Sequence, residues 1–265
     1  MRNIAVIPAR FSSKRLPGKP LVKIGDRTLI EHVYRRAAQA ERIERVLVAT
    51  DDSRILEVVT AFGGECVMTS PDHRSGTDRV AEAVAELDAD IIVNVQGDEP
   101  FVEARAIDQA IEACENHPEA IATLACPISA AEEYWDPNVV KVVMDRRGFA
   151  LYFSRWPIPF VASPEMSLET LRRLGDRATP PPAGPCLKHQ GLYVYPKSVL
   201  RDLTRSEPTP LERQERLEQL RALELGFPIH VALTEAAGIA VDTPADLERA
   251  RQIFASTGSA TTRSI

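Results

Sequence analysis

IIVNVQGDEP, residues 91–100, gives the clearest indication of how this chain folds. Its first five residues are almost entirely apolar, which is typical of a short strand buried on both faces of a sheet. The remaining five are polar or turn-forming and place Asp98 and Glu99 directly after that strand. In open α/β sheets, ligands bind beyond the carboxyl ends of the strands. The stretch therefore predicts a buried strand that leads into a binding site.

Strands and helices alternate around this stretch, from the N-terminus to about residue 116. Short apolar runs predict strands at residues 4–7, 45–49, 65–68 and 91–95. Apolar residues at helical spacing predict helices at 28–40, 54–62, 77–87 and 104–116. Because the strands are apolar throughout rather than alternating, we expect a mostly parallel sheet with helices on both faces.

The order changes after residue 121. Strands are expected at residues 122–126, 139–145, 149–154, 191–195 and 229–233, with a hairpin turn at 146–148 and helices at about 211–225 and 244–254. Residues 156–185 contain seven prolines, which oppose a long helix or a central strand. We therefore expect one α/β domain over residues 1–254, with a β-rich insertion at about 122–195, and a disordered tail at 255–265.

The composition argues against several classes of protein. The 265 residues are 44% apolar and 26% charged, as in soluble globular proteins, and the net charge is −6. A mildly acidic chain is a poor candidate for binding nucleic acid or an anionic membrane surface. The four cysteines lack zinc-type spacing and no signal-peptide pattern occurs, so we expect reduced thiols in a cytoplasmic protein.

A basic loop follows the first predicted strand. Residues 8–21 read PARFSSKRLPGKPL and hold four basic side chains between positions 10 and 19. The loop contains neither a dinucleotide-binding nor a P-loop fingerprint, yet basic side chains, hydroxyls and amides at a strand end are what a triphosphate needs. The alternative interpretation is a solvated basic surface loop.

Carboxylates follow two strands. Asp98 and Glu99 follow the strand at 91–95, and Asp242 stands in VDTP, residues 241–244, at a later strand end. Carboxylate oxygens are ligands that Mg²⁺ prefers. Alternatively, these side chains cap or precede the helices that begin near Glu103 and Pro244. Together with the basic loop, they indicate a metal–nucleotide site.

These residues belong to segments that resemble the CMP-sugar synthetases, and more narrowly the 3-deoxy-manno-octulosonate (KDO) cytidylyltransferase family. The resemblance covers about residues 4–250 and is carried by ARFSSKRLPGKPL (9–21), ATD (49–51), HRSGTDR (73–79), NVQGDEP (94–100), PNVVKVV (137–143), ALYFSR (150–155), HQGLY (189–193), PLE (210–212), LEQLR (217–221) and VDTP (241–244). The stretch between Arg155 and His189 departs from the family pattern, because it is longer and richer in proline. That departure leaves the choice of sugar open.

The resemblance implies both a fold and a reaction. The fold is nucleotide-diphospho-sugar-transferase-like (Rossmann-like), a mostly parallel sheet with helices on both faces and a β-rich insertion. The reaction is that of a nucleotidyltransferase, which transfers CMP from CTP to KDO and releases pyrophosphate, with Mg²⁺ as cofactor, for lipopolysaccharide biosynthesis in a Gram-negative-type cell. The resemblance also implies a cytoplasmic homodimer whose partners are CTP and KDO, not nucleic acid or membrane.

The resemblance implies roles for individual residues as well. The metal ligands are Asp98 and Asp242, and the catalytic set is Arg10, Lys19, Asp98 and Asp242. The CTP-binding set is Ala9, Arg10, Ser12, Arg15, Lys19, Ser75, Arg79 and Gln96. The sugar-binding set is Arg155, His189, Tyr193, Glu218 and Gln219. Without the resemblance, Glu218 and Gln219 would be interpreted as a solvated helix face, His189 as a structural histidine and Tyr193 as strand packing. Glu99, Glu212 and Lys141 are expected to have structural or supporting roles.

Two other functions stay open at this point. One is a sibling enzyme that activates a sialic-type acid or 8-amino-KDO, although the PGKPL and LEQLR segments favour KDO. The other is a catalytically silent nucleotide-sugar-binding module, which the joint presence of Arg10, Lys19, Asp98 and Asp242 argues against. Residues 156–185 are expected to close over the site when both substrates bind, and the alternative is a passive surface loop.

Overall fold

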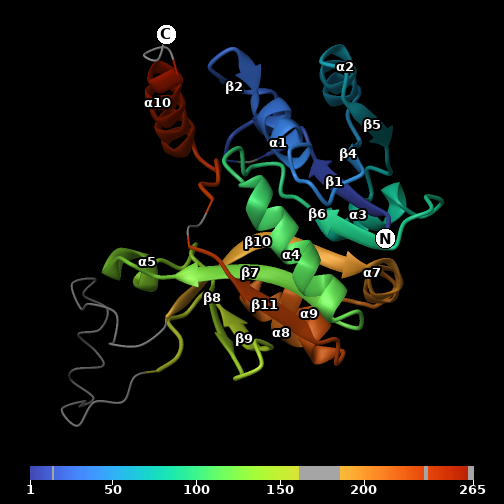
Figure 1. Cartoon of the computed structure of the whole chain (residues 1–265), viewed down its shortest axis with the longest axis vertical. Coiled ribbons are helices and arrows are strands. Elements are labelled where there is room, and N and C mark those ends of the chain that lie inside the picture. Colours follow the sequence, from blue (N-terminus) through green and yellow to red (C-terminus); the bar gives the residue numbers. More distant parts are fainter. Residues whose placement is uncertain (14, 161–185, 236–237, 262–265) are drawn as a thin grey trace.

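The computed structural model of the chain describes residues 1–13, 15–160, 186–235 and 238–261, the last five by their backbone alone (Figure 1). A nine-stranded sheet forms its centre, with β11-β7-β10-β6-β1-β4-β5 as the main order and β8 and β9 attached beside β10. The strands are β1 (Asn3–Ala9), β4 (Arg45–Thr50), β5 (Glu65–Met68), β6 (Ile91–Asn94), β7 (Ile121–Pro127), β8 (Lys141–Met144), β9 (Ala150–Ser154), β10 (Leu187–Pro196) and β11 (Ile229–Leu233).

One strand of the main path runs against all the others. β10 pairs antiparallel with β6 and with β7, whereas the remaining pairs along the path are parallel. β10 therefore begins where its neighbours end: Leu187 lies opposite Pro127, and Tyr193 lies opposite Asn94. The mostly parallel α/β architecture confirms the predicted fold class.

Helices bury both faces of the sheet, as the apolar strands predict. Along β1, Ala5 and Ile7 belong to one buried cluster, and Ile4 and Val6 to another. The first cluster includes side chains of α1, α2 and α4, and the second includes side chains of α3, α7 and α9. These helices are α1 (Leu29–Ala37), α2 (Ser53–Ala61), α3 (Gly76–Ala83), α4 (Ala104–Asn116), α7 (Lys197–Thr204) and α9 (Gln219–Glu224).

The C-terminal helix returns to the N-terminal part of the chain. α10 (Pro244–Thr261) lies beside the small β2–β3 hairpin (Lys23–Ile24, Arg27–Thr28), which follows the short 3-10 helix η1 (Lys19–Leu21) (Figure 1). A third buried cluster joins Leu16 and Ile24 to Val241 and Leu247. This packing brings the segment that contains Asp242 back to the loop after β1.

The structure corrects the helix predicted over residues 211–225. Two helices occupy this stretch, α8 (Pro210–Glu215) and α9, and Arg216 between them adopts a left-handed conformation with φ 56°. The break lets Arg221 of α9 form an ion pair with the buried Glu212 of α8, with 2.6 Å between Nη2 and Oε1. The apolar residues of this stretch have the spacing expected for a single helix, and the same spacing fits two short helices. Periodicity alone therefore does not reveal the break.

Other differences concern short or terminal elements. Sequence analysis does not predict α5 (Ala131–Trp135) or α7, because each is too short for its periodicity to stand out. The tail expected to be disordered from residue 255 is helical as far as Thr261, since no proline interrupts the chain after Pro244, and 262–265 lie outside the described residues. Most of the predicted closing segment, 161–185, also lies outside them. No helix in the described part of the chain is long and apolar enough to cross a membrane.

Lys141 is a fully buried cation with no carboxylate partner among the described residues. Its Nζ donates to the carbonyls of Asp136, Val139 and Arg155, at 2.9, 2.7 and 2.9 Å. Burial lowers the pKa of Lys141 to about 8, so the ammonium is still mostly charged at pH 7 and has three protons to donate. The side chain therefore ties the loop before β8 to the end of β9.

We predict that Lys141→Met lowers the free energy of unfolding by roughly 2 kcal/mol at pH 7, because three carbonyls lose a charged donor. Urea unfolding followed by circular dichroism measures the loss. Lys23→Met, at an exposed position on β2, is the control and is expected to stay near wild type. A Lys141→Met protein as stable as this control would contradict the structural role.

Candidate active site

A cavity of about 530 Å³ lies at the edge of the sheet where the parallel strands end. Several elements contribute to its lining: the loop after β6, the start of α3, β10, the end of β9, the turn between α8 and α9, and the segment before α10. It brings together the whole predicted sugar-binding set with three residues of the predicted CTP and metal sets: Arg155, His189, Tyr193, Glu218, Gln219, Gln96, Asp98 and Asp242. The remaining predicted residues are not part of its lining: Ala9, Arg10, Ser12, Arg15, Lys19, Ser75 and Arg79.

Two carboxylates meet on a single ammonium at one end of this cavity. Lys19 Nζ lies 2.7 Å from Asp98 Oδ2 and 2.9 Å from Asp242 Oδ1. Arg15 Nη2 lies 3.0 Å from the other oxygen of Asp242. Burial disfavours the charge on Lys19, but hydrogen bonds and charge from both carboxylates raise its pKa above the ordinary value. Lys19 is therefore held protonated between Asp98 and Asp242.

The loop that carries these cations is folded back on itself. Gly18 adopts a left-handed conformation with φ 67°, and its N–H donates to the carbonyl of Phe11. A Cβ at Gly18 would lie 3.2 Å from Phe11 Cζ, so glycine suits both the angle and the space. Arg10 extends from the loop and donates to the carbonyls of His73 and Ser75. These contacts fix the basic loop against the segment that leads into α3.

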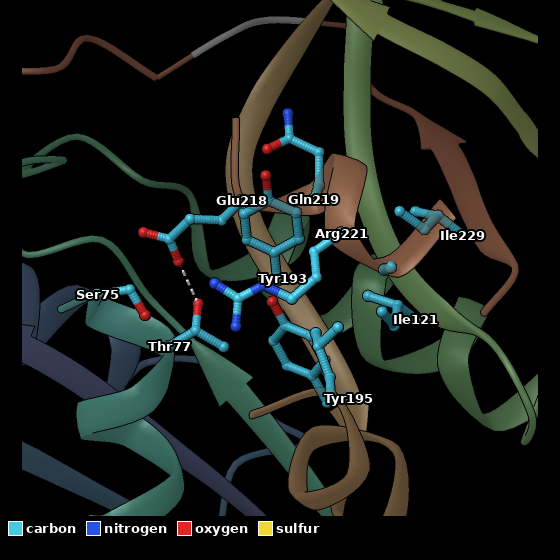
Figure 2. A pocket seen from close by; sticks show the side chains of 11 residues that line it. Ser75, Thr77, Ile121, Tyr193, Tyr195, Glu218, Gln219, Arg221 and Ile229 are labelled. Atoms are coloured by element: carbon cyan, nitrogen blue, oxygen red, sulfur yellow. Dashed lines mark hydrogen bonds between the residues drawn. The ribbon is translucent and has the colours of Figure 1, made fainter. Parts of the chain in front are cut away.

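The start of α3 supports the part of the cavity that Tyr193, Glu218 and Gln219 line. The Ser75 hydroxyl accepts from Asp78 N at 3.0 Å and caps the helix. Thr77 Oγ1 donates to Glu218 Oε2 at 2.7 Å, and Figure 2 shows these two side chains pointing toward each other. Burial of its carboxyl raises the pKa of Glu218, although the residue as a whole is exposed and lines the cavity. Thr77 thus holds an acidic side chain beside Tyr193 and Gln219.

Arg155 supplies positive charge to the lining of the cavity. Its guanidinium donates to the carbonyls of Pro137, Glu215 and Arg216, at 3.0, 2.9 and 3.4 Å. No carboxylate forms an ion pair with it within the described ranges. Carbonyls hold the guanidinium in place, and the nearby Glu215 carboxylate accepts from the backbone N–H of Arg155 instead, so the guanidinium can pair with an anionic ligand.

Among the predicted CTP-binding residues, of which Gln96 alone lines the cavity, Arg79 is the most deeply buried. It is fully buried and does not line the cavity. Nη2 lies 2.9 Å from Asp51 Oδ2, and Nη1 donates to the Thr69 hydroxyl. Of the remaining CTP-binding candidates, Ala9 is buried at the end of β1 and Ser12 is exposed on the basic loop. The contacts give Arg79 a supporting position behind the loop that leads into α3.

The cavity also contains Lys188, Glu133 and Asn138, which sequence analysis did not assign to it, and Glu99, for which it expected a supporting role. Lys188 forms an ion pair with Glu133 of α5, and Asn138 lies on the loop before β8. Glu99 lies between Gly191 and Gly238, where added Cβ atoms would lie 3.5 and 3.1 Å from its carboxylate oxygens. Burial, with the charge of Asp98, raises the pKa of Glu99 to about 7. The only sequence signal for Lys188 is its position, directly before the HQGLY segment.

The carboxylates and the histidine that line this cavity do not form a large cluster of metal ligands. Within the described ranges, no group of three or more His, Cys, Asp or Glu side chains is placed to hold a metal ion. The carboxylates that share Lys19 form a pair. The four cysteines are free thiols, three of them buried.

Comparisons with known proteins agree on one family. A family model described as cytidylyltransferase matches residues 4–229. The chain is 51% identical over 246 residues to a 3-deoxy-manno-octulosonate cytidylyltransferase of Syntrophotalea carbinolica, covering 92% of this chain and 95% of the relative. It is 49% identical over 255 residues to the protein of the same name in Pelobacter propionicus, covering 96% and 98%.

Solved structures agree with the sequence relatives. The chain is similar to CMP:2-keto-3-deoxy-manno-octonic acid synthetase complexed with CTP, with a TM-score of 0.86, 41% identity, and coverage of 97% of this chain and 100% of that one. A 4-diphosphocytidyl-2C-methyl-D-erythritol synthase, at 18% identity and a TM-score of 0.61, shares the fold.

The buried position of Arg79 leads to a prediction that distinguishes a structural role, through Asp51 and Thr69, from direct binding of CTP. Removing a buried cation leaves Asp51 and Thr69 without their partner, which typically costs about 3 kcal/mol. Arg79→Met is therefore expected to lower the free energy of unfolding by roughly that amount in urea denaturation, and Arg79→Met/Asp51→Asn is expected to recover part of it. A variant of wild-type stability that no longer binds CTP would instead support direct contact with the nucleotide.

Proposed function

This chain belongs to the cytidylyltransferase family, and we propose that it transfers CMP from CTP to KDO with release of pyrophosphate. The observation that carries the proposal is the cavity itself. Two of its carboxylates form ion pairs with Lys19 and Arg15 of the basic loop, and its lining also holds the Arg155 guanidinium among hydrogen-bonding side chains. A triphosphate and a polyhydroxy acid are the two ligands that this charge distribution suits.

The carboxylate pair fits Mg²⁺. Asp98 and Asp242 lie close enough to share one ammonium, so the site already requires a positive charge between them. Mg²⁺ is commonly held by one or two protein carboxylates together with substrate phosphates and water, so a third protein ligand is not needed. We therefore propose Asp98 and Asp242 as its ligands. When bound there, Mg²⁺ neutralises phosphate charge and makes a nearby hydroxyl more acidic.

The basic loop suits the leaving group. Negative charge develops on pyrophosphate as the α-phosphate is transferred, and fixed cations lower the energy of that charge. Arg10, Arg15 and Lys19 all project from the loop after β1. Lys19 lies between the two carboxylates in this structure, and we propose that it would bind the phosphates once Mg²⁺ is held by Asp98 and Asp242.

The residues proposed for the sugar orient the acceptor. Arg155 offers a cation for the carboxylate of the acid sugar, and His189, Tyr193, Glu218 and Gln219 offer hydrogen bonds for its hydroxyls. Holding the anomeric hydroxyl near the α-phosphate replaces a bimolecular encounter with a fixed geometry. The long stretch before His189 keeps a sibling acid sugar as the second candidate.

The cellular setting follows from the reaction. Activation of KDO serves lipopolysaccharide biosynthesis, and CTP is a cytoplasmic nucleotide, so we propose a cytoplasmic enzyme in a Gram-negative-type cell. We also propose a homodimer, as the family resemblance implies. Gel filtration with light scattering tests the dimer independently of activity.

A substrate panel tests the function. Pyrophosphate release is measured with CTP, Mg²⁺ and, in turn, KDO, 8-amino-KDO and a sialic acid. We expect the highest kcat/KM with KDO. A higher value with another acid sugar would identify the sibling enzyme, and no release with any of the three would indicate a binding module.

Variants of the carboxylates test the metal site. Asp98→Asn and Asp242→Asn each keep the shape but remove one negative charge, so each is expected to lower kcat at least about 100-fold at limiting Mg²⁺. Asp202→Asn, at an exposed position on α7, is the control and is expected to keep wild-type activity. Near-normal activity in either folded active-site variant would refute a site built on both carboxylates.

A further inference from the structure

A bulge interrupts β10 beside the cavity. Gln190 pairs with Leu124 and Tyr193 pairs with Thr123, so Gly191 and Leu192 have no partner on β7. An added Cβ at Gly191 would lie 3.2 Å from Gln96 Cγ and 3.5 Å from Glu99 Oε1, which favours glycine there. Bulges of this kind redirect backbone groups and side chains next to active sites. Here the bulge turns two carbonyls toward the side chain of Thr123.

Thr123 is fully buried, and its hydroxyl contacts three polar groups. Oγ1 lies 2.7 Å from the carbonyl oxygen of Leu192, 3.3 Å from that of Gln190 and 2.9 Å from Nε2 of His189. Both carbonyl oxygens can only accept a hydrogen bond, and the hydroxyl has one proton to donate. A 2.7 Å separation between two oxygens requires that proton between them. The Thr123 proton is therefore assigned to Leu192.

The assignment decides the protonation of His189. With its one proton donated to Leu192, Oγ1 can only accept from His189, so Nε2 must carry a hydrogen. Burial lowers the pKa of His189 to about 3, which leaves the ring neutral with a single N–H at physiological pH. Nδ1 then has a free lone pair. It has no hydrogen-bond partner in the part of the chain that the structure describes, and the side chain lines the cavity.

We infer that Thr123 is a positioning residue that holds His189 in the tautomer protonated on Nε2, so that Nδ1 accepts a hydrogen bond from a hydroxyl of the sugar. The inference rests on the proposed function for the identity of that ligand, and on the contacts of Thr123 for the tautomer. The rings of Phe153 and Tyr193, with centroids 5.1 and 5.3 Å from that of His189, restrict rotation of the imidazole.

The tautomer limits which part of the substrate lies against His189. A neutral imidazole that presents a lone pair attracts a hydroxyl and repels a carboxylate. The carboxylate of the acid sugar therefore belongs at Arg155, where the guanidinium is unneutralised within the described ranges. A site built to hydrogen-bond a hydroxyl also discriminates strongly against an analogue that lacks it.

Two variants of Thr123 separate this role from simple packing. Thr123→Val keeps the shape but removes the acceptor for Nε2–H, so we expect the KM for KDO to rise about tenfold while the KM for CTP stays within twofold. Thr123→Ser restores the hydroxyl and is expected to restore the KM. Thr204→Val is the matched control, because it removes a hydroxyl that donates to Leu200 on α7, away from this cavity.

NMR of the ¹⁵N-histidine-labelled protein reads the tautomer directly, with His189→Gln assigning the signal. We expect a proton on Nε2 and none on Nδ1 in the wild type from pH 6 to 8, and mixed tautomers in Thr123→Val. A proton on Nδ1 in the wild type would overturn the inference, as would Thr123→Val with both the tautomer and the KM for KDO unchanged. If Thr123→Val raised the KM for CTP as much as the KM for KDO, Thr123 would only contribute packing, and the inference would fail. If the wild type released no pyrophosphate with KDO, the proposed function would fail, and the NMR result would still decide the tautomer.

Discussion

The Lys19 ammonium lies between the carboxylates of Asp98 and Asp242 and thereby joins three segments that are far apart in the sequence. Two carboxylates this close repel each other unless a cation lies between them. Apolar packing of Leu16 and Ile24 against Val241 and Leu247 keeps the outer segments together, so the charges cannot simply move apart. The fold therefore keeps Asp98 and Asp242 so close together that a cation is needed between them.

The direction of β10 is the second constraint. Parallel strands deliver only their carboxyl ends to the binding edge of a sheet, so their side chains reach a ligand through the loops that follow them. An antiparallel strand begins at that same edge, and β10 places His189 and Tyr193 there, on either side of its bulge. Side chains on strands are held more precisely than side chains on loops. β10 thus supplies one wall of the cavity, which is where we propose that the sugar binds.

Much of the fold could be predicted from apolar runs and helical spacing. The strands at 65–68 and 229–233 and the helix at 104–116 have the predicted bounds. The direction of β10 could not be predicted, because an apolar strand has the same pattern whichever way it runs. The left-handed residue Arg216 was missed for a related reason: a break that keeps the apolar spacing leaves no periodic signal.

Most residues of the candidate site were predicted from the family resemblance. The structure then distinguishes those that line the cavity from those that do not. The resemblance places Arg79 and Gln96 together around the nucleotide, whereas in the structure Gln96 lines the cavity and Arg79 is buried against Asp51. Lys188 and Glu133 are 55 residues apart, and only the folded chain shows them as a pair in the cavity wall. The role of Thr123 was equally hidden, because it depends on a bulge and on the count of protons at one hydroxyl.

The most direct measurement of the central claim is a crystal structure with CTP and Mn²⁺ in place of Mg²⁺, with the metal located by its anomalous scattering. The account predicts a manganese peak in contact with both Asp98 and Asp242, and Lys19 Nζ on a phosphate oxygen rather than between the carboxylates. A manganese peak remote from either carboxylate, or CTP bound while Lys19 still bridges Asp98 and Asp242, would contradict it.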